Sequence, residues 1–366
     1  MRAAELREAS GRAVLHLEVG QPSTPAPKPV IASAHAALDA DLLGYTTAPG
    51  IEVLRERIAG HYADWYGVTV DPDAVLVTVG ASGAFVAAFM AAFDVGARVA
   101  VPSPGYPCYR NVLELLGVEV VDVPTTTETR FQPTTAQLER IAAEGPIDGL
   151  VLSSPSNPTG TMLDDTRLAE VAGWCRARGA WFVSDEIYHG ITYDEAAMTA
   201  LRHDPDAIVV NSFSKYFSMT GWRLGWLIAP PALREVLVRI GQNAVIAAPT
   251  LAQLAAVAAF DSHEECRANV DRYRRNRAVL VEGLAAAGIH DLAPADGAFY
   301  VWARTDHLDD DSPRLCRRWL DEIGVAATPG IDFDPVHGHR FVRFSFSGAE
   351  HDIREAVSRL RGWSGT

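Results

Sequence analysis

Asn211–Gly225, with the sequence NSFSKYFSMTGWRLG, is the stretch on which the interpretation of this chain depends. It begins where an apolar run, 207–211, is predicted to end as a buried strand. Lys215 is one of only two lysines among 32 basic residues, the other being Lys28. Arginine is essentially never deprotonated, so it cannot replace a lysine that acts as a neutral amine nucleophile. Unless Lys215 survives by chance, the composition makes it a candidate for covalent chemistry.

Short apolar runs alternate with helical patterns on the N-terminal side of this stretch. Strands are predicted at 74–79, 98–101, 118–123, 149–153, 181–184 and 207–211. Helices are predicted at 51–66, 82–93, 135–143 and 165–178. This alternation favours an α/β fold, with a mostly parallel sheet covered by helices on both faces. A further strand, expected to be antiparallel, follows at 224–228.

The character of the sequence changes near residue 262. The helical pattern over 262–287 carries many arginines between acidic residues, which favours a solvated helix that bridges two domains over a nucleic-acid patch. Strands are expected at 299–302 and 340–346, and helices at 313–323 and 350–361. We therefore predict an N-terminal arm that belongs to the small domain (1–45), a large domain (46–261) and a smaller α+β domain (262–366).

Composition and charge exclude several classes of protein. The 366 residues are 48% hydrophobic and 21% charged, which excludes a disordered, collagen-like or coiled-coil chain. The formal net charge of −14 argues against binding to nucleic acid or to an anionic membrane. The N-terminus lacks an apolar signal segment and the longest apolar stretch, 244–260, is interrupted, so no membrane span is expected. Four scattered cysteines without a CxxC pair predict free thiols, no metal site and a cytoplasmic location.

Two further motifs lie where predicted strands end. VGASGA at 79–84 joins a strand to a helix, and small residues at a helix N-terminus are suited to binding an anion. A tight turn without a ligand is the alternative for this motif. SPSNPTG at 154–160 follows a predicted strand at its carboxyl end, where open α/β sheets bind ligands. Asn157 offers a fixed amide there, although Asn-Pro and Gly are also common in plain turns.

Asp185 stands at the end of the apolar run 181–184, where a carboxylate is unfavourable unless it is paired. Its partner is either an arginine of the chain or a cationic atom of a ligand. A lysine among hydroxyls and near Arg223, an acid at a neighbouring strand end and an anion-binding helix start are together what pyridoxal phosphate requires. The amine forms the covalent link, the anion site holds the phosphate, and the carboxylate keeps the pyridine nitrogen protonated.

Further motifs follow in order along nearly the whole chain, and with them the sequence resembles the class I/II aminotransferases of the fold-type I pyridoxal-phosphate enzymes. These motifs are EVGQPS with Gly20, Tyr45 ahead of APGIEVLRERIA, Ala81-Ser82-Gly83, PSPGYPCY with Tyr106, SNPTG, DEIY, SFSK…GWRLG, and FVRFSFS with Arg343. The resemblance implies a large domain with a seven-stranded, mostly parallel sheet flanked by helices, and a smaller α+β C-terminal domain.

The resemblance also implies a role for each matching position. Lys215 is implied to be the Schiff-base lysine, and Asp185 the partner of the pyridinium nitrogen. Asn157 and Tyr188 are implied to donate to the phenolic oxygen of the cofactor ring, and Tyr106 to stack on the ring. The implied phosphate ligands are Ala81, Ser82, Gly83, Ser212, Ser214 and Arg223, joined by Tyr45 from the neighbouring subunit of a homodimer. The implied substrate contacts are Gly20, Asn157 and, for the carboxylate, Arg343.

The implied activity is ping-pong transamination between an L-amino acid and a 2-oxo acid. A β-lyase, a decarboxylase and an aminocyclopropane-carboxylate-forming enzyme share the same cofactor residues and are alternatives. A sensor-type regulator would need a DNA-binding segment that the 45-residue arm cannot supply. A nicotinamide-dependent reductase would need spaced glycines that GASGAF lacks, and would explain neither Lys215 nor Arg223. The preferred amino acid is not predicted.

Overall fold

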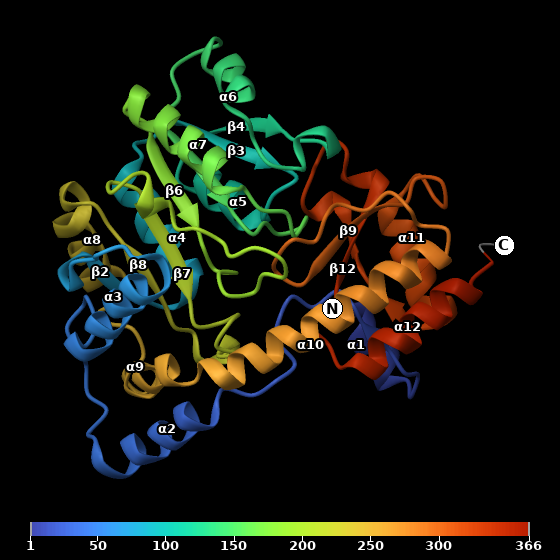
Figure 1. Ribbon diagram of the computed structural model, residues 1–366, viewed down its shortest axis with the longest axis horizontal. Helices are drawn as coiled ribbons and strands as arrows, with labels where there is room; N and C mark the ends of the chain where they lie inside the picture. Colours follow the sequence, from blue (N-terminus) through green and yellow to red (C-terminus); the bar gives the residue numbers. More distant parts are fainter. Residues whose placement is uncertain (1, 365–366) are drawn as a thin grey trace.

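The computed structural model describes residues 2–364 and has a mixed seven-stranded sheet at its centre (Figure 1). The strands are β2 (Val75–Thr78), β3 (Arg98–Ser103), β4 (Glu119–Pro124), β5 (Gly149–Ser153), β6 (Trp181–Asp185), β7 (Ile208–Ser212) and β8 (Gly225–Ile228). Their order is β2-β8-β7-β6-β5-β3-β4. β8 runs antiparallel to both of its neighbours and the other pairs are parallel, which confirms the predicted α/β fold.

Helices cover both faces of this sheet because successive strand residues point to opposite sides. In β7, Val209 packs in one apolar cluster and Val210 in the other. The Val210 side is covered by α4 (Gly80–Ala92), α5 (Pro107–Leu115) and α8 (Pro231–Ala244). The Val209 side is covered by α3 (Glu52–Tyr66), α6 (Thr135–Ala142) and α7 (Asp165–Arg178). The sheet is therefore the middle of three layers.

A long helix, α10 (His263–Ala286), connects the central sheet to a smaller C-terminal unit (Figure 1). This unit contains an antiparallel sheet in the order β11-β12-β9. Its strands are β9 (Tyr300–Arg304), β11 (Thr328–Pro329) and β12 (Phe341–Ser345), and its helices include α11 (Ser312–Arg318) and α12 (Glu350–Gly362). α12 packs along α10, so the long helix is part of the C-terminal core as well as the connection.

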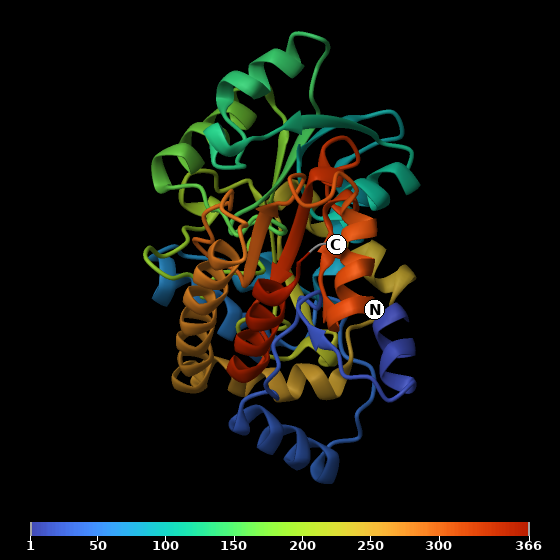
Figure 2. The ribbon, with the colours of Figure 1, turned by 90° about the vertical axis from the view of Figure 1, so that its right-hand side faces the viewer.

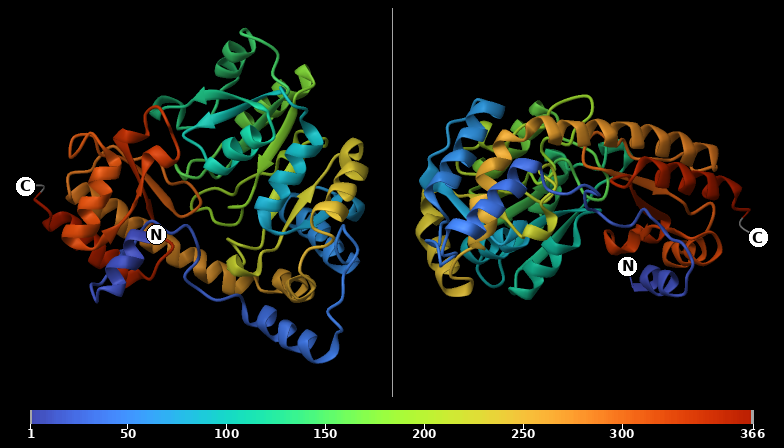
Figure 3. Two further views of the ribbon diagram at one scale, coloured as in Figure 1. Left: turned by 180° about the vertical axis from the view of Figure 1, so that it is seen from behind. Right: turned by 90° about the horizontal axis from the view of Figure 1, so that it is seen from below.

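The first 45 residues contain two helices and contact both ends of the molecule. α1 (Arg2–Ala9) and β1 (Leu15–His16) lie with the C-terminal unit, where β1 pairs in parallel with β10 (Val325–Ala326) (Figure 2). α2 (Lys28–Ala40) instead packs on α9 (Thr250–Ala256) at the far end of the molecule (Figure 3). The segment between β1 and α2 therefore crosses from one unit to the other.

The carboxyl ends of the central strands lie side by side. The register pairs Ser153 of β5 with Asp185 of β6, and Asp185 with Val210 of β7. The loops that follow these strands carry the SNPTG, DEIY and SFSK motifs. These motifs therefore converge at the sheet edge where open α/β folds bind ligands.

Within residues 2–364, no helix is both long and apolar enough to cross a membrane. All four cysteines are free thiols. In the same range, no group of three or more His, Cys, Asp or Glu side chains is arranged to hold a metal ion.

Candidate active site

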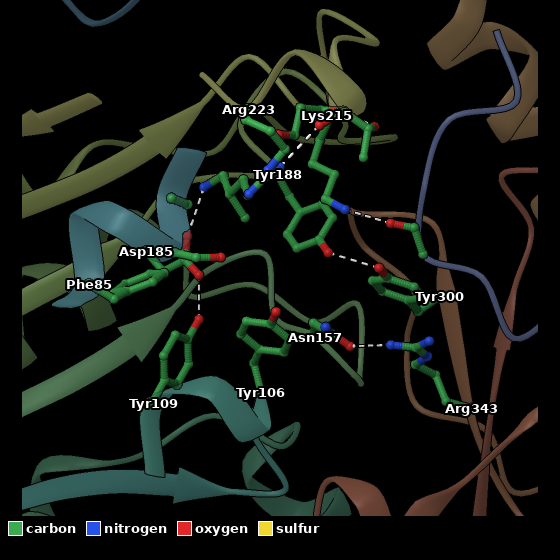
Figure 4. Close-up of a pocket in the computed structure, with 16 residues that line it drawn as sticks. Phe85, Tyr106, Tyr109, Asn157, Asp185, Tyr188, Lys215, Arg223, Tyr300 and Arg343 are labelled. Atoms are coloured by element: carbon green, nitrogen blue, oxygen red, sulfur yellow. Dashed lines mark hydrogen bonds between the residues drawn. The ribbon is translucent and has the colours of Figure 1, made fainter. Parts of the chain in front are cut away.

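A cavity of about 290 Å³ lies at the carboxyl edge of the central sheet, next to the C-terminal unit (Figure 4). It is lined by Gly20, Ala81, Ser82, Phe85, Tyr106, Tyr109, Asn157, Asp185, Ile187, Tyr188, Ser214, Lys215, Thr220, Arg223, Tyr300 and Arg343. Three of these side chains are cationic, Lys215, Arg223 and Arg343, and one is acidic. Within residues 2–364, none of the three cations lies within ion-pairing distance of a carboxylate. The cavity therefore presents unneutralised positive charge, which suits an anionic ligand.

Asp185, the single acid of the cavity, is almost completely buried. The Tyr109 hydroxyl donates to its Oδ2, and the backbone N–H of Ile187 donates to its Oδ1 at 3.0 Å. Burial raises the pKa of Asp185 to about 6, although both hydrogen bonds lower it. No arginine of the described chain forms an ion pair with this carboxylate, so the expected alternative of an arginine partner is wrong. Asp185 is free to face a cationic ligand atom.

Lys215 lies three residues beyond the end of β7, and its side chain extends into the cavity (Figure 4). Burial lowers its pKa to about 8, and the positive charges of Arg343 and Arg223 contribute to the lowering. Its Nζ donates a hydrogen bond to the carbonyl of Gly20, on the segment that crosses between the two units. A substantial fraction of neutral amine is therefore available near pH 8, as a nucleophile or general base requires.

One end of the cavity is formed by the start of α4 and by Arg223. Gly80 has φ +67°, and a Cβ at this position would lie 2.6 Å from Nη2 of Arg223, so only glycine fits there without displacement. Ala81 and Ser82 belong to the first turn of α4, whose backbone N–H groups have no partner within the helix. The hydroxyl side chain of Ser214 completes this end. The helix dipole, the free N–H groups and the guanidinium are together suited to binding an anion.

The opposite end of the cavity holds Arg343, on β12. Its Nη1 donates to Oδ1 of Asn157 at 2.8 Å, and its Nη2 donates to the carbonyl of Glu18 at 2.7 Å. The guanidinium lies 4.4 Å from the ring centre of Tyr300 and 4.7 Å from that of Phe333. Its Nε is buried without a hydrogen-bond partner. Neutral groups thus hold the arginine in place and leave its charge for a planar anion such as a carboxylate.

Aromatic rings line the space between the two ends. Tyr106 lies edge-on to Tyr109, with 5.5 Å between ring centres. The hydroxyls of Tyr188 and Tyr300 are 2.8 Å apart, and Nζ of Lys215 lies 5.8 Å from the centre of the Tyr188 ring. The cavity thus combines flat apolar walls with an anion-binding end, an arrangement suited to a planar ring that carries a phosphate.

Most of the candidates from the sequence are brought together by the fold. Eleven of the fourteen line the cavity: Gly20, Ala81, Ser82, Tyr106, Asn157, Asp185, Tyr188, Ser214, Lys215, Arg223 and Arg343. Gly83, Ser212 and Tyr45 do not. Gly83 lies further along the first turn of α4, and the Ser212 hydroxyl is within hydrogen-bond distance of Ser214 Oγ (2.8 Å). Tyr45 is 84% exposed, so it is available to a second molecule but not to its own cavity.

Five residues that line the cavity were not predicted from the sequence: Phe85, Tyr109, Ile187, Thr220 and Tyr300. Tyr109 could have been found, because it lies three residues after Tyr106 and so returns to the same side of α5. Tyr300 had no local indication, because it is part of an ordinary buried strand, β9, and reaches the cavity only through the position of the C-terminal unit.

Comparison with known proteins agrees with this geometry. The family model for aminotransferase class I and II matches residues 12–360. A valine–pyruvate aminotransferase from Mycobacterium tuberculosis is 48% identical over 367 residues, covering 99% of this chain and 94% of the relative. An aspartate/prephenate aminotransferase from Thermus thermophilus is 34% identical, covering 98% and 93%. The crystal structure of an aminotransferase from Mycobacterium tuberculosis has a TM-score of 0.97 at 48% identity, covering 99% and 94%. Thermus thermophilus aspartate aminotransferase with maleate has a TM-score of 0.93 at 32% identity, with the same coverage.

Proposed function

The chain belongs to the class I and II aminotransferase family, and from this premise we propose that the cavity around Lys215 binds pyridoxal 5'-phosphate. The protein is an aminotransferase, so its reaction moves an amino group between an amino acid and a 2-oxo acid. The observation that supports the cofactor most directly is the charge of the cavity, which holds one buried acid and three cations that form no ion pair within residues 2–364. A phosphate, a substrate carboxylate and a pyridine nitrogen match those charges.

The donor set of the cavity fits this cofactor. Arg223, Ser214 and the first N–H groups of α4, from Ala81 to Gly83, would hold the phosphate, while Ser212 supports Ser214 from behind. Asp185 would pair with the pyridine nitrogen, and a cation at that position would favour its ionised form. Asn157 and Tyr188 would donate to the ring oxygen, and Tyr106 would stack on the ring.

When bound, the cofactor supplies an aldehyde carbon for covalent attachment to an amine and a ring that accepts the electrons of the substrate Cα–H bond. The chain supplies positioning and proton transfer. Arg343 binds the α-carboxylate through two parallel N–H groups, and Asn157, which already contacts Arg343, lies beside that carboxylate. Nζ of Lys215, with a pKa of about 8, takes the proton from Cα as the general base.

The amino donor in this proposal is an amino acid with a neutral side chain, such as valine, and the acceptor is pyruvate. The relative from Mycobacterium tuberculosis is named for these two compounds. Once the phosphate occupies Arg223 and the α-carboxylate occupies Arg343, no further arginine or lysine in the lining is left for a carboxylate on the substrate side chain, since Lys215 is the reacting amine. A lyase or decarboxylase reaction is the alternative, and it would release pyruvate with ammonia, or carbon dioxide, without amino transfer.

The functional unit in this proposal is a cytoplasmic homodimer. Tyr45 is 84% exposed and Leu42 beside it is 96% exposed, so both offer apolar surface to a second copy. Tyr45 of each copy would reach the cofactor phosphate of its neighbour. Light scattering should give twice the monomer mass of 39.5 kDa, and a monomeric enzyme with full activity would exclude the shared site.

The variant Lys215→Arg tests the assignment, because it retains the charge but removes the nucleophile. We expect the loss of visible cofactor absorbance, of borohydride-trapped label and of amino transfer from valine to pyruvate. Lys28→Arg is a matched control, because Lys28 is exposed and is the only other lysine. A trapped label on Lys28, or transfer retained in Lys215→Arg, would contradict the proposal. Single-turnover absorbance changes with valine and with aspartate test the proposed donor class, and a response to aspartate alone would overturn it.

A further inference from the structure

The Tyr300 hydroxyl has a single hydrogen-bond partner among residues 2–364, the hydroxyl of Tyr188 at 2.8 Å. The bond joins the two units of the molecule, because Tyr300 lies on β9 and Tyr188 follows β6 (Figure 4). Both side chains are buried, and both line the cavity. The contact is therefore maintained by the packing of the two units.

The local structure holds the Tyr300 hydroxyl in this position. A Cβ at Gly20 would lie 2.2 Å from the Tyr300 Oη, so the missing side chain at Gly20 leaves the space that the hydroxyl occupies. The Arg343 guanidinium lies 4.4 Å from the Tyr300 ring centre. A cation at the ring face draws electron density from the phenol and makes its O–H a stronger donor.

The number of protons decides the direction of the hydrogen bond. Each tyrosine hydroxyl carries one proton. If Tyr188 uses its proton to donate to the ring oxygen of the cofactor, as proposed above, then Tyr300 must donate to Tyr188. In such a chain, a hydroxyl that accepts a hydrogen bond becomes a stronger donor, so the bond from Tyr300 strengthens the bond that Tyr188 donates.

We propose that Tyr300 is a positioning residue that donates its proton to Tyr188 and thereby strengthens the hydrogen bond from Tyr188 to the cofactor ring oxygen. This inference rests on the proposed cofactor. A stronger bond to that oxygen stabilises its anionic form, and this lowers the pKa of the nitrogen that joins Lys215 to the cofactor. Tyr300 therefore acts on a group that it does not touch.

The test is the pH midpoint of the visible absorbance of the cofactor-loaded protein, which requires no substrate. Tyr300→Phe retains the ring over Arg343 and removes only the hydroxyl, so we expect the midpoint to rise by about half a pH unit. Tyr188→Phe should raise it further. In the double variant, Tyr300→Phe should add no shift, because the group through which it acts is already gone. Tyr193→Phe is the control, because it removes a buried hydroxyl that donates to the Ala298 carbonyl outside the cavity, and it should leave the midpoint unchanged.

An unchanged midpoint in Tyr300→Phe would overturn the inference, as would an equal shift in the presence and absence of the Tyr188 hydroxyl. These outcomes differ from failure of the proposed function. If pyridoxal 5'-phosphate does not bind at Lys215, the parent protein itself shows no pH-dependent visible band.

Discussion

The Tyr109 hydroxyl donates a hydrogen bond to the Asp185 carboxylate, so α5 supports the acid at the end of β6. In Tyr109→Phe, one of the two donors to this carboxylate is lost and its pKa should rise further above the value of about 6. We expect the affinity for pyridoxal 5'-phosphate to fall about tenfold at pH 6 and less at pH 8, where the carboxylate is ionised in both proteins. Spectral titration at the two pH values measures this difference, and equal affinities at pH 6 would contradict it.

Asp185 should destabilise the cofactor-free protein at neutral pH. Its folded pKa of about 6 exceeds the ordinary aspartate pKa of 3.8, so between these two pH values the folded state holds a proton that the unfolded state has lost. Stability therefore falls as pH rises through this range and stays lower above it. Above pH 6, the free energy of unfolding of cofactor-free Asp185→Asn should exceed that of the parent protein by up to about 3 kcal/mol. This difference should vanish near pH 4.

Thermal unfolding of the cofactor-free protein across this pH range measures the gain. Asp94→Asn is a suitable control, because Asp94 is exposed, and it should show no such pH-dependent gain. A stability difference for Asp185→Asn that is constant with pH would show that packing rather than ionisation is responsible.

Arg343 and Arg223 should have separable functions, because they lie at opposite ends of the cavity. Lysine retains the charge but cannot bind a planar anion through two parallel N–H groups. In Arg343→Lys, we expect substrate affinity to fall about 10- to 100-fold with the cofactor retained. Arg223→Lys should lose cofactor affinity instead. The rate of cofactor dissociation measures the effect on cofactor binding, and the substrate dependence of the half-reaction measures the effect on substrate binding. If both variants lost cofactor affinity and substrate affinity to the same extent, the two arginines would not have separate functions.

Gly80→Ala should weaken cofactor binding without unfolding the protein. The new Cβ would lie 2.6 Å from Nη2 of Arg223, and φ +67° is strained for alanine, so both the arginine and the helix start must shift. We expect about a tenfold loss of affinity for the cofactor. Gly173→Ala is the matched control, because Gly173 also lies in a helix, has free space around it and does not line the cavity. Equal affinity in the two variants would rule out this role of Gly80.

The central sheet and the chemistry at its edge could be predicted because their determinants are local. The central strands are short, largely apolar runs, and Asp185 stands at the end of one of them while Lys215 lies three residues beyond the end of another. The N-terminal arm was less predictable. Prolines at 22, 25, 27 and 29 favour extended chain, but the alanine-rich segment from Lys28 forms α2, since its apolar side packs on α9.

Residues that reach the cavity through tertiary packing could not be found from the sequence. Tyr300 lies beside Arg343 because β9 and β12 pair in the C-terminal sheet, and both side chains reach the cavity only because that unit lies next to the carboxyl edge of the central sheet. Ser212 and Ser214 both match the motif, but Ser212 is the last residue of β7 and Ser214 lies in the turn that follows, and only Ser214 lines the cavity. Local sequence patterns therefore predict the motif residues of the site, whereas the packing of the two units decides which side chains line the cavity.

β12, which carries Arg343, belongs to a different sheet from β6 and β7, which lead to Asp185 and Lys215. Substitutions in the C-terminal sheet and its loops can therefore change which substrate is bound while the residues proposed to hold the cofactor stay unchanged. Related enzymes with different substrates would then differ most in the residues that bind the substrate and least in the residues proposed to hold the cofactor.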